Sequence, residues 1–459
     1  MTTAFSSLGL QADLLANLAT LDYRSMTPIQ AGSLPLILAG HDVIAQGKTG
    51  SGKTAAFGLG LLNKLAVERF AVQALVLCPT RELADQVARE IRRLGRGIHN
   101  IKVLTLCGGM PLGPQIGSLE HGAHVVVGTP GRIEEHLGKG SLTLEQLSTL
   151  VLDEADRMLD MGFQASLDAI LEHVPTQRQT LLFSATYPPE IEAIAQRVMQ
   201  SPQQVQVEST HDSSSIAQAF YRVEDSERSL ALRLLLLQQR PDSAVIFCNT
   251  RAECAEVARE LTSHGFSAQA LHGDLEQRER DRILTRFASK SLSVLVATDV
   301  AARGLDIDAL DAVINYHIPR DLDVYIHRIG RTGRAGSRGL ACTLFSEKED
   351  HKLAKLEARL EQSIVAEPLP SRDLLKTPAY KPPMVSLEIG AGKKQKLRPG
   401  DILGALTSEN GIDGSQVGKI SIHDNWACVA VRRKAVDTAL DKLGRGKVKG
   451  RSLRVRVLG

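Results

Sequence analysis

Short, continuous apolar runs recur along the first half of the chain, and a polar motif follows each of them. The runs are VQALVLC, AHVVVG, STLVLD and QTLLFS, followed by PTRELA, TPGR, EAD and AT. Continuous rather than alternating apolar character is typical of strands in a parallel sheet that is covered on both faces. Helical patterns separate the runs, so this half is predicted to be α/β. The polar residues should then cluster along one edge of the sheet, where such sheets bind ligands.

The same pattern returns after a Ser-rich segment, in the runs SAVIFC, SAQAL, SVLVAT, DAVIN and GLACTLF. A Pro-rich stretch then interrupts it, and strand-like and helical segments alternate beyond. The expected organisation is a first α/β lobe over 1–207, a flexible linker over 208–215, a second α/β lobe over 216–366, a Pro-rich linker over 367–384 and a small α+β module over 385–459.

Composition places the chain among ordinary globular proteins. Of its 459 residues, 43% are hydrophobic and 23% are charged, which is enough to build sizeable cores. No apolar run approaches the roughly 18–20 residues of a membrane span, and the N-terminus lacks the pattern of a secretion signal. The six cysteines are scattered without a CxxC pair that would suggest a zinc or redox site. We therefore expect a protein of the reducing cytoplasm.

The net charge of +3 hides an uneven distribution along the chain. Residues 385–459 contain 15 Lys and Arg against 7 Asp and Glu, a net charge of +8. Subtraction from the totals of 55 and 52 leaves 40 basic and 45 acidic residues over 1–384, a net charge of −5. The C-terminal module is therefore predicted to bind a polyanion, and a merely solubilising basic tail is the alternative.

The segment GKTGSGKT, residues 47–54, matches the P-loop pattern G-x-x-x-x-G-K-[ST] in full. It lies between an apolar run and a helical pattern, which is the context of a nucleotide-binding loop. Backbone N–H groups beside the glycines can surround phosphate oxygens, Lys53 reaches the β- and γ-phosphates, and the Thr54 hydroxyl ligates Mg²⁺. A plain Gly/Ser turn is the alternative. The residues expected to bind ATP here are Gly47, Lys48, Thr49, Gly50, Ser51, Gly52, Lys53 and Thr54.

A P-loop requires a carboxylate at the end of another buried strand, and STLVLDEAD supplies it. Asp153 is expected to hold Mg²⁺, and Glu154 is expected to polarise an attacking water. A helix N-terminus that favours acidic residues is the alternative for an isolated DEAD segment. The pairing with the P-loop favours catalysis, with ATP and Mg²⁺ as cofactors.

The segment HRIGRTGRAG, residues 327–336, places Arg328, Arg331 and Arg334 among three glycines. The second lobe has no P-loop of its own, so the two lobes are predicted to share one nucleotide. Arg331 and Arg334 would then stabilise the charge that develops on the γ-phosphoryl group, an effect of about 10³–10⁵ in rate. His327 and Arg328 would position this loop or link it to neighbouring motifs. A patch that contacts a phosphate backbone is the alternative for each of these arginines.

Together, these motifs resemble those of the DEAD-box RNA helicases, in the order of that family and over about residues 5–346. The segments that carry the resemblance are YRSMTPIQ, AQGKTGSGKT, PTRELA (79–84), Gly108–Gly109, TPGR (129–132), DEAD, SAT (184–186), VIFCNT, a Gln277/Arg280 pair, VATDVAARGLDI (296–307) and HRIGRTGR. The resemblance implies an α/β fold of two tandem RecA-like parallel-sheet lobes.

The resemblance also implies roles for individual residues. Gln30 would read the adenine edge with Tyr23 stacked near the base, and Gly304 and Asp306 would touch the nucleotide. The catalytic set would be Lys53, Asp153, Glu154, Arg331 and Arg334. The set that couples ATP to RNA would be Asp156, Ser184, Thr186 and His327. The set that holds the RNA backbone would be Pro79, Thr80, Arg81, Gly109, Thr129, Arg132, Arg280 and Thr298.

Two positions depart from the family pattern. Asp22 stands where the family usually has glycine before the aromatic residue of YRSMTPIQ, which affects the local backbone geometry. His317 in VINYHIP stands where Asp is common, which affects a contact that supports lobe closure. Neither departure removes a catalytic group, and no chemistry is assigned to His317.

The C-terminal module resembles the RNA-binding domain of DbpA-type DEAD-box proteins, which is RRM-like. The shared stretches are AGKKQKLRPGDILGALT, GIDGSQVGKISIH and KVKGRSLRVRVL. The resemblance implies binding to a hairpin of large-subunit ribosomal RNA. The strand WACVAVR lacks the aromatic series with which an ordinary RRM stacks bases, and Trp426 has a stacking role and a core role as alternatives. The residues expected to hold RNA are Lys393, Lys394, Lys396, Arg432, Arg433, Lys434, Lys447, Lys449 and Arg451.

The predicted function is an RNA-dependent ATPase that locally unwinds RNA duplexes during large-subunit ribosome assembly. Its expected partners are ribosomal RNA and the pre-ribosomal particle, and it is expected to be a monomer without membrane contact. An ATP-gated RNA clamp that does not need to unwind is the alternative from another class. A DNA translocase is disfavoured by the combination of YRSMTPIQ, DEAD, SAT and HRIGRTGR.

Overall fold

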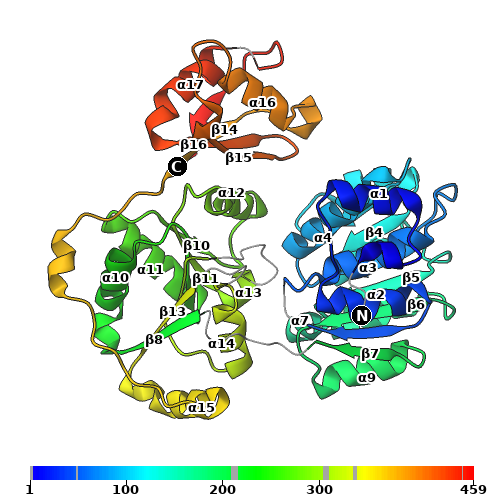
Figure 1. Ribbon diagram of the computed structural model, residues 1–459, viewed down its shortest axis with the longest axis horizontal. Helices are drawn as coiled ribbons and strands as arrows, with labels where there is room; N and C mark the ends of the chain where they lie inside the picture. Colours follow the sequence, from blue (N-terminus) through cyan, green and yellow to red (C-terminus); the bar gives the residue numbers. More distant parts are fainter. Residues whose placement is uncertain are drawn as a thin grey trace. The chain divides into compact units, whose positions relative to one another are not determined.

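The computed structural model describes residues 4–47, 50–207, 216–302, 310–333, 339–446 and 448–458 (Figure 1). These residues fall into two compact units. The first unit contains lobe 1 and extends to Val207, and the second contains lobe 2 and the C-terminal module and begins at Ile216. The expected linker over 208–215 lies outside the described residues.

The described strands of lobe 1 form one parallel sheet in the order β3-β4-β2-β5-β6-β1-β7. They are β1 (Val43–Gln46), β2 (Ala74–Leu77), β3 (Val103–Leu106), β4 (Val125–Gly128), β5 (Thr149–Asp153), β6 (Gln179–Ser184) and β7 (Gln203–Gln206). Strands β2, β4, β5 and β6 are buried along their whole length, which explains their unbroken apolar sequences.

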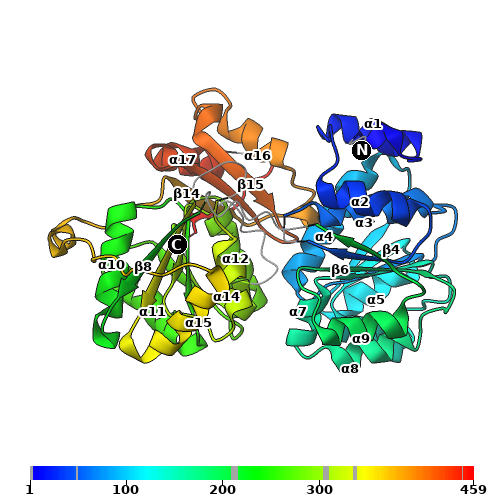
Figure 2. The ribbon, with the colours of Figure 1, turned by 60° about the horizontal axis from the view of Figure 1, so that its bottom comes forward.

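Helices cover both faces of this sheet (Figure 2). One face packs against α1 (Ala12–Thr20), α2 (Pro28–Leu38), α3 (Lys53–Lys64) and α4 (Arg81–Leu94). The other face packs against α6 (Pro130–Gly138), α7 (Ala155–Asp160), α8 (Gln164–Leu171) and α9 (Pro189–Val198). Neighbouring residues of β2 point to opposite faces, so Val76 belongs to the first core and Leu75 to the second. The shorter elements are η1 (Phe5–Ser7), η2 (Gly95–Gly97) and α5 (Leu112–Glu120).

Lobe 2 repeats this design with a parallel sheet in the order β10-β11-β9-β12-β13-β8. Its described strands are β8 (Ile216–Arg222), β9 (Ala244–Cys248), β10 (Ala268–Leu271), β11 (Val294–Thr298), β12 (Ala312–Asn315) and β13 (Gly339–Phe345). Its described helices are η4 (Asp225–Glu227), α10 (Arg228–Gln239), α11 (Arg251–Ser263), α12 (Gln277–Ala288), α13 (Asp299–Ala302), α14 (Leu322–Ile329), η5 (Glu347–Glu349) and α15 (Asp350–Leu360). The prediction of two parallel-sheet lobes is confirmed.

The C-terminal module is a small antiparallel sheet with two helices packed on one face. Its strands are β14 (Met384–Ile389), β15 (Val417–Ile422), β16 (Ala427–Arg432) and β17 (Val455–Val457), in the order β15-β16-β14-β17. Its longer helices are α16 (Pro399–Leu406) and α17 (Val436–Arg445), and its short ones are η7 (Lys393–Gln395), η8 (Gly414–Gln416) and η9 (Arg433–Ala435). The chain order βαββαβ with the two central strands β14 and β16 confirms the RRM-like fold.

The Pro-rich stretch 367–384 packs on lobe 2 through much of its length. The Glu367 amide donates to the carbonyl of Phe220, and η6 (Arg372–Lys376) packs against α10. Tyr380 is buried in the core of lobe 2, where its ring contacts Phe266 edge-to-face at 6.0 Å. The stretch between lobe 2 and the module is therefore an integral part of the lobe surface.

Among the described residues, no helix is long and apolar enough to cross a bilayer. All six cysteines are described, and each is a buried free thiol.

Candidate nucleotide and RNA site

The functional motifs of lobe 1 lie at the carboxyl edge of its sheet. The P-loop follows β1, the DEAD segment follows β5, and SAT follows β6, and these three strands are near neighbours in the sheet. PTRELA follows β2, Gly108–Gly109 follow β3 and TPGR follows β4, on the adjoining part of the same sheet. The strand order therefore places nucleotide motifs towards one side of the edge, RNA motifs towards the other, and SAT and DEAD between them.

The P-loop is linked to SAT and contains its own partner for the catalytic lysine. The Gly47 amide donates to the Ser184 carbonyl at 3.0 Å, which links the start of the loop to the end of β6. Lys53 is buried, and its Nζ donates to the Gly47 carbonyl at 2.8 Å. A phosphate oxygen in the loop would have to replace this carbonyl as the partner of the ammonium. Lys48 and Thr49 lie outside the described residues.

Gln30 contacts the P-loop directly. Its Oε1 accepts from the Thr27 amide at 2.9 Å, and its Nε2 donates to the Gly52 carbonyl at 3.1 Å. Thr27 Oγ1 also donates to the Ser51 carbonyl at 2.7 Å. A Cβ on Gly52 would lie 2.5 Å from the side-chain nitrogen Nε2 of Gln30. Gly52 also has a φ of +93°, so glycine is required there. The role of Gln30 in reading adenine stays a prediction. Its hydrogen bond to Gly52 would connect a bound adenine to the P-loop.

Tyr23 and Asp22 lie at the turn after α1. The Tyr23 hydroxyl donates to Glu90 Oε1 at 2.8 Å, and burial together with this carboxylate raises the pKa of Tyr23 to about 12. Asp22 has a φ of +60°, a conformation that glycine adopts freely and that Asp tolerates better than most residues. The departure from glycine therefore preserves the turn, and the Asp22 carboxylate pairs with Arg24 Nε at 2.6 Å.

Asp153 and Thr54 supply a donor set that suits Mg²⁺. Burial raises the pKa of Asp153 to about 7, against the opposing charge of Lys53 and with a further upward effect of Glu154. A carboxylate destabilised in this way gains from a cation. No cluster of three or more His, Cys, Asp or Glu ligands occurs in the described part of the chain. One carboxylate and one hydroxyl fit Mg²⁺, which usually keeps several waters and binds substrate phosphates.

Glu154 is held in place by a buried ion pair. It has a φ of +55° at the start of α7, and its Oε2 accepts from Arg157 Nη1 at 2.7 Å. Both side chains are almost fully buried. Arg157 thus compensates the charge of a carboxylate that has little water around it. Arg157 is a further residue of the site that the sequence motifs did not predict, although its position one residue after DEAD was a usable signal.

Asp156 connects DEAD to SAT. Its Oδ2 accepts from the Thr186 amide at 3.0 Å and from Thr186 Oγ1 at 2.8 Å, and its own amide lies 3.4 Å from Ser184 Oγ. Burial alone would raise the pKa of Asp156, but the Thr186 hydrogen bonds and the charge of Lys53 lower it below its usual value. Three of the four residues predicted to couple ATP and RNA, namely Asp156, Ser184 and Thr186, are therefore in direct contact.

The loops after β2 and β3 bring two predicted RNA residues together. Thr80 begins α4, and its Oγ1 accepts from the Leu83 amide at 3.2 Å, while Pro79 just before it is buried. Gly109 is exposed with a φ of +73°, and a Cβ there would lie 3.8 Å from Arg81 Nη1. An arginine beside an exposed backbone turn is suited to phosphate contact without base reading.

The loop after β4 adds Thr129 and Arg132 to the same edge. Thr129 precedes α6, whose first residue is Pro130, and both Arg132 Nη atoms donate to the Met110 carbonyl at 3.0 Å. Arg132 thereby links the TPGR helix to the loop that contains Gly109. The predicted RNA residues of lobe 1 are gathered at one part of the sheet edge, and their contact with RNA stays a prediction.

In lobe 2, Arg280 and Thr298 also lie beyond neighbouring strands, β10 and β11. Arg280 is in the first turn of α12, and its Nη1 donates to the His272 carbonyl at 3.2 Å. Thr298 is the last residue of β11, and its Oγ1 accepts weakly from the Ala301 amide at 3.4 Å. The strand order places them on the same side of this edge.

Arg328 is a fully buried structural residue. Its Nε and Nη2 donate to the two carboxylate oxygens of Asp299 at 2.6 and 2.7 Å, and its Nη1 donates to Asn315 Oδ1 and to the His317 carbonyl. Its guanidinium also lies 5.0 Å from the Phe247 ring centroid. Such bidentate pairing fixes the helix that precedes the glycines of HRIGRTGR. The sequence analysis missed Asp299, although it directly follows Thr298.

Arg331 follows α14 and is buried, and His327 lies within that helix. Three further residues of the prediction, Arg334, Gly304 and Asp306, lie outside the described residues. The predicted contacts of these residues with the nucleotide therefore stay predictions.

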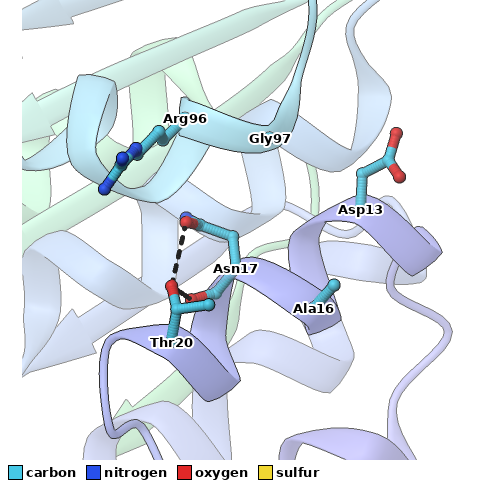
Figure 3. Close-up of a pocket in the computed structure, with 6 residues that line it drawn as sticks. All are labelled: Asp13, Ala16, Asn17, Thr20, Arg96 and Gly97. Carbon is cyan, nitrogen blue, oxygen red and sulfur yellow. Dashed lines mark hydrogen bonds between the residues drawn. The ribbon is translucent and has the colours of Figure 1, made fainter.

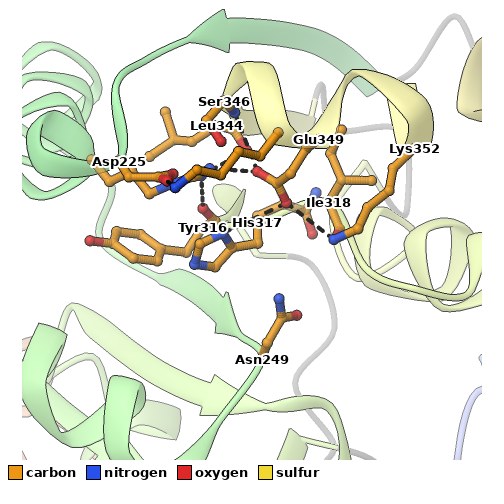
Figure 4. A network of polar contacts seen from close by, with 12 residues as sticks. Asp225, Asn249, Tyr316, His317, Ile318, Leu344, Ser346, Glu349 and Lys352 are labelled. Atoms are coloured by element: carbon orange, nitrogen blue, oxygen red, sulfur yellow. Dashed lines mark hydrogen bonds and ion pairs between the residues drawn. The ribbon is translucent and has the colours of Figure 1, made fainter. Parts of the chain in front are cut away.

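His317 is the centre of a polar network in lobe 2 (Figure 4). Its Nε2 lies 2.6 Å from Glu253 Oε1, and its Nδ1 lies 3.7 Å from Glu349 Oε1. Glu349 also pairs with Arg228 at 2.5 Å and with Lys352 at 3.3 Å. Burial alone would lower the pKa of His317, but its hydrogen bond to the Glu253 carboxylate and its contact with Glu349 raise it. Burial alone would raise the pKa of Glu349, but its contacts with His317 and Arg228 lower it to about 2. The raised pKa favours the charged form of His317, which joins α11 and η5 to the segment after β12.

The basic residues of the module form two separate groups. Strand β14 pairs antiparallel with β16, with Met384 opposite Arg432 and Ile389 opposite Ala427. The two groups of basic residues therefore lie at opposite ends of β14. Near the Ile389 end lie Lys393, Lys394, Lys396, Lys449 and Arg451. Lys449 Nζ donates to the Lys396 carbonyl at 2.7 Å. Near the Met384 end lie Arg432, Arg433 and Lys434. Arg433 Nη2 donates to the Pro382 carbonyl at 3.0 Å, and Lys447 lies outside the described residues.

A pocket of about 360 Å³ lies between α1 and η2 (Figure 3). Its lining residues are Asp13, Ala16, Asn17, Thr20, Arg96 and Gly97. Asn17 Nδ2 donates to the carbonyls of Arg93 and Leu94, at 2.9 and 2.7 Å, and thereby fixes α1 against α4. None of the six lining residues belongs to the predicted site.

Comparison with known proteins identifies the family. Residues 27–194 match the DEAD/DEAH box helicase model, 227–336 match the helicase conserved C-terminal domain, and 386–457 match the DbpA RNA binding domain. The ATP-dependent RNA helicase DbpA of Escherichia coli is 50% identical over 457 residues, covering 99% of this chain and all of that protein. The chain belongs to the DEAD-box ATP-dependent RNA helicases of DbpA type.

Two further comparisons agree with this family. The DEAD-box ATP-dependent RNA helicase CshA of Geobacillus kaustophilus is 45% identical and covers 77% of this chain and 76% of its own length. The structure of S. cerevisiae Dbp5 bound to RNA and ADP BeF3 superposes with a TM-score of 0.73 and 30% identity, covering 81% of this chain and 96% of that one. This DEAD-box helicase thus uses ATP and binds RNA, as predicted from its motifs.

The contact of Asp156 with Thr186 makes a prediction about this helicase. Replacing Thr186 with Val removes a hydrogen bond to a charged group, which is worth about 1.5–3 kcal/mol, or roughly ten- to hundredfold. We expect duplex unwinding to fall by about that factor while RNA-stimulated ATP hydrolysis changes by less than about threefold. Thr186→Ser keeps the hydroxyl and should restore unwinding. Unwinding by Thr186→Val at the unmodified rate would contradict the coupling role.

His317 makes a prediction about pH. A histidine whose folded-state pKa is raised stabilises the fold below its unfolded pKa of about 6.5, and this contribution is lost as pH rises through the folded value. We expect His317→Gln to lower the melting temperature of the helicase more at pH 6 than at pH 8.5, as measured by calorimetry. His264→Gln, at an exposed position after α11, is the control. An equal loss at both pH values would show that His317 is not a charged partner.

Proposed function

We propose that this helicase is an RNA-dependent ATPase that separates short RNA duplexes, and that its C-terminal module directs it to a hairpin of large-subunit ribosomal RNA during ribosome assembly. The observation behind this proposal is the match over both the motor and the module to a DbpA-type helicase. It acts as a monomer on the pre-ribosomal particle in the cytoplasm.

In this mechanism the P-loop residues rearrange when ATP binds. Lys53 exchanges its hydrogen bond to the Gly47 carbonyl for bonds to phosphate oxygens. Gln30 binds the adenine and also contacts the Gly52 carbonyl, so binding of the base affects the position of the loop. Thr54 and Asp153 would hold Mg²⁺, whose charge would neutralise the phosphates. Glu154 orients the attacking water, with Arg157 fixing its carboxylate. Arg331 and Arg334 of lobe 2 stabilise the charge of the γ-phosphoryl group.

RNA and ATP together favour a closed arrangement of the two lobes, because each ligand binds residues from both. The RNA residues of lobe 1 and lobe 2 hold the phosphate backbone without reading bases. A backbone held in a form that a duplex cannot adopt releases the opposite strand, and hydrolysis resets the cycle. Thr186 and Asp156 transmit the state of one site to the other.

The Lys393–Lys396 end of the module is the surface proposed to hold ribosomal RNA. Three lysines in one turn lie beside the turn that contains Lys449 and Arg451. At the Arg432–Lys434 end, Arg433 donates to the Pro382 carbonyl, so fewer of its N–H groups are available to an RNA phosphate. Such phosphate contacts would make binding strongly dependent on salt.

Glu154→Gln tests the hydrolytic role. The amide keeps the size of the side chain but removes the base, so we expect ATP binding to persist and RNA-stimulated turnover to fall by about 10² or more. Turnover is measured by phosphate release and binding by a fluorescent ATP analogue. Turnover at the unmodified rate would rule out Glu154 as the residue that positions water.

The target is tested with a panel of RNAs, including fragments of large-subunit ribosomal RNA. We expect one fragment to stimulate ATP hydrolysis at a concentration at least tenfold below unrelated RNA of equal length. Exchanging Lys393, Lys394 and Lys396 for Glu should abolish that preference, because the turn would repel phosphates. The matched control exchanges Arg432 and Lys434 for Glu. Equal stimulation by all RNAs would overturn the targeting proposal, and stimulation without strand separation would favour an ATP-gated clamp.

A further inference from the structure

Within the second unit, the sheet of the C-terminal module packs against the end of α12 and the segment after it, as Figures 1 and 2 show from two directions. The face concerned is the one that α16 and α17 leave uncovered. Leu387, Ile389 and Val429 point to those helices, whereas Ser386 and Cys428 point the other way. In an ordinary RRM this second face presents the aromatic residues that stack bases.

A cluster of buried hydroxyl groups forms the centre of this contact. Ser386 Oγ of β14 lies 3.0 Å from Ser289 Oγ and 2.6 Å from Ser291 Oγ, which themselves lie 3.3 Å apart. The two lobe 2 serines also donate to the Arg286 carbonyl, at 3.0 and 3.1 Å. Ser386 is 1% exposed. Hydroxyls buried without partners are costly, so this mutual pairing indicates two surfaces built to fit each other.

Ionic and ring contacts surround the hydroxyl cluster. Arg282 Nη2 of α12 donates to Glu388 Oε1 at 2.9 Å. Thr285 Oγ1 lies 3.2 Å from Nε2 of His423, whose ring stacks on Trp426 with centroids 3.9 Å apart. This stacking accounts for Trp426 in part, since the indole is buried within the protein rather than open to a base.

The covered face is unsuited to nucleic acid. Its central residues are Ser386, Glu388, Cys428 and Ala430, all buried and none aromatic. Glu388 offers a phosphate no hydrogen-bond donor, and its carboxylate is paired with Arg282 of α12 and with Arg456 of β17. The Lys393–Lys396 turn lies beyond the end of β14, outside the strands that form this face.

We propose that the uncovered sheet face of the C-terminal module is a docking surface for α12 of lobe 2, and that the module binds RNA while it remains docked. The module is then carried on lobe 2 in a fixed orientation rather than on a free tether. Because Arg280 lies in the first turn of the same helix, one rigid element connects the module to the RNA residues of the motor. This inference concerns how the module is held and does not depend on which RNA it recognises.

A reversible covalent lock tests the proposal in the full-length chain. Cysteines replace Ser291 and Ser386, whose oxygens are 2.6 Å apart, on a Cys428→Ala background that removes the thiol beside Ser386. A disulfide requires about 2 Å between sulfurs, so little movement is needed. We expect most molecules to cross-link under mild oxidation, as seen by non-reducing electrophoresis. The control pair Ser291→Cys and Ser408→Cys should not cross-link, because Ser408 follows α16 on the opposite face.

The locked protein is then compared with the same protein after reduction. We expect the two forms to bind transcribed large-subunit ribosomal RNA with affinities within about twofold. Cross-linking no greater than in the control pair would overturn the docking. A loss of affinity of about tenfold or more, reversed by reductant, would show that RNA needs the sheet face and would equally overturn the proposal. If neither form binds ribosomal RNA more tightly than unrelated RNA, the targeting proposal fails. The extent of cross-linking still tests the docking in that case.

Charge reversal provides a measurement that needs no cysteine. Arg282→Glu places a carboxylate against Glu388, whereas Arg278→Glu makes the same change at an exposed position of the same helix. We expect amides over 384–389 to exchange hydrogen at least fivefold faster in Arg282→Glu than in Arg278→Glu. Equal exchange in the two variants would count against a docked face, whatever the outcome of the cysteine experiment.

Discussion

The parallel strands of lobe 1 all end at one edge, and the arrangement of its functional residues depends on this constraint. Neighbouring strands lie about 4.8 Å apart, so residues that follow adjacent strands are close even when they are distant in sequence. The P-loop, SAT, DEAD and the RNA loops occupy successive positions along this edge. The connection from Lys53 to Thr186 through Asp156 therefore needs no long pathway, because it crosses neighbouring strands of one rigid sheet.

Buried charges at this edge differ in how they are compensated. Glu154 and Arg328 have close partners of opposite charge, Arg157 and Asp299, and their positions are thereby fixed. Burial instead raises the pKa of Asp153 to about 7 against the charge of Lys53, which suits a residue that must bind a cation. A buried charge that is neutralised by a neighbouring side chain fixes the position of the residue. A buried charge that is only partly neutralised leaves the residue able to bind a ligand of opposite charge.

Sequence patterns predicted the buried centre of the two parallel sheets well, because strands covered on both faces are continuously apolar. They did not predict β3, β7 and β8, which lie at sheet edges, nor β14. Strand β7 reads QQVQ and is largely exposed, and β14 alternates serine and glutamate with apolar residues. The family resemblance likewise predicted Asp156, Ser184 and Thr186, together with His327, as one group. It could not predict Arg157, Glu253, Glu349 or the serine cluster, because those contacts depend on tertiary packing between segments without a recognisable motif.

The burial of Tyr380 in lobe 2 changes where the motor ends as a folding unit. If lobe 2 were cut at the start of the Pro-rich stretch, it would lose the Tyr380 ring, which fills part of its hydrophobic core beside Phe266. A gene fusion that exchanges RNA-binding modules between such helicases would therefore keep this stretch with its own lobe. Evolutionary shuffling of the module is under the same restriction, so the stretch and lobe 2 are inherited as one piece.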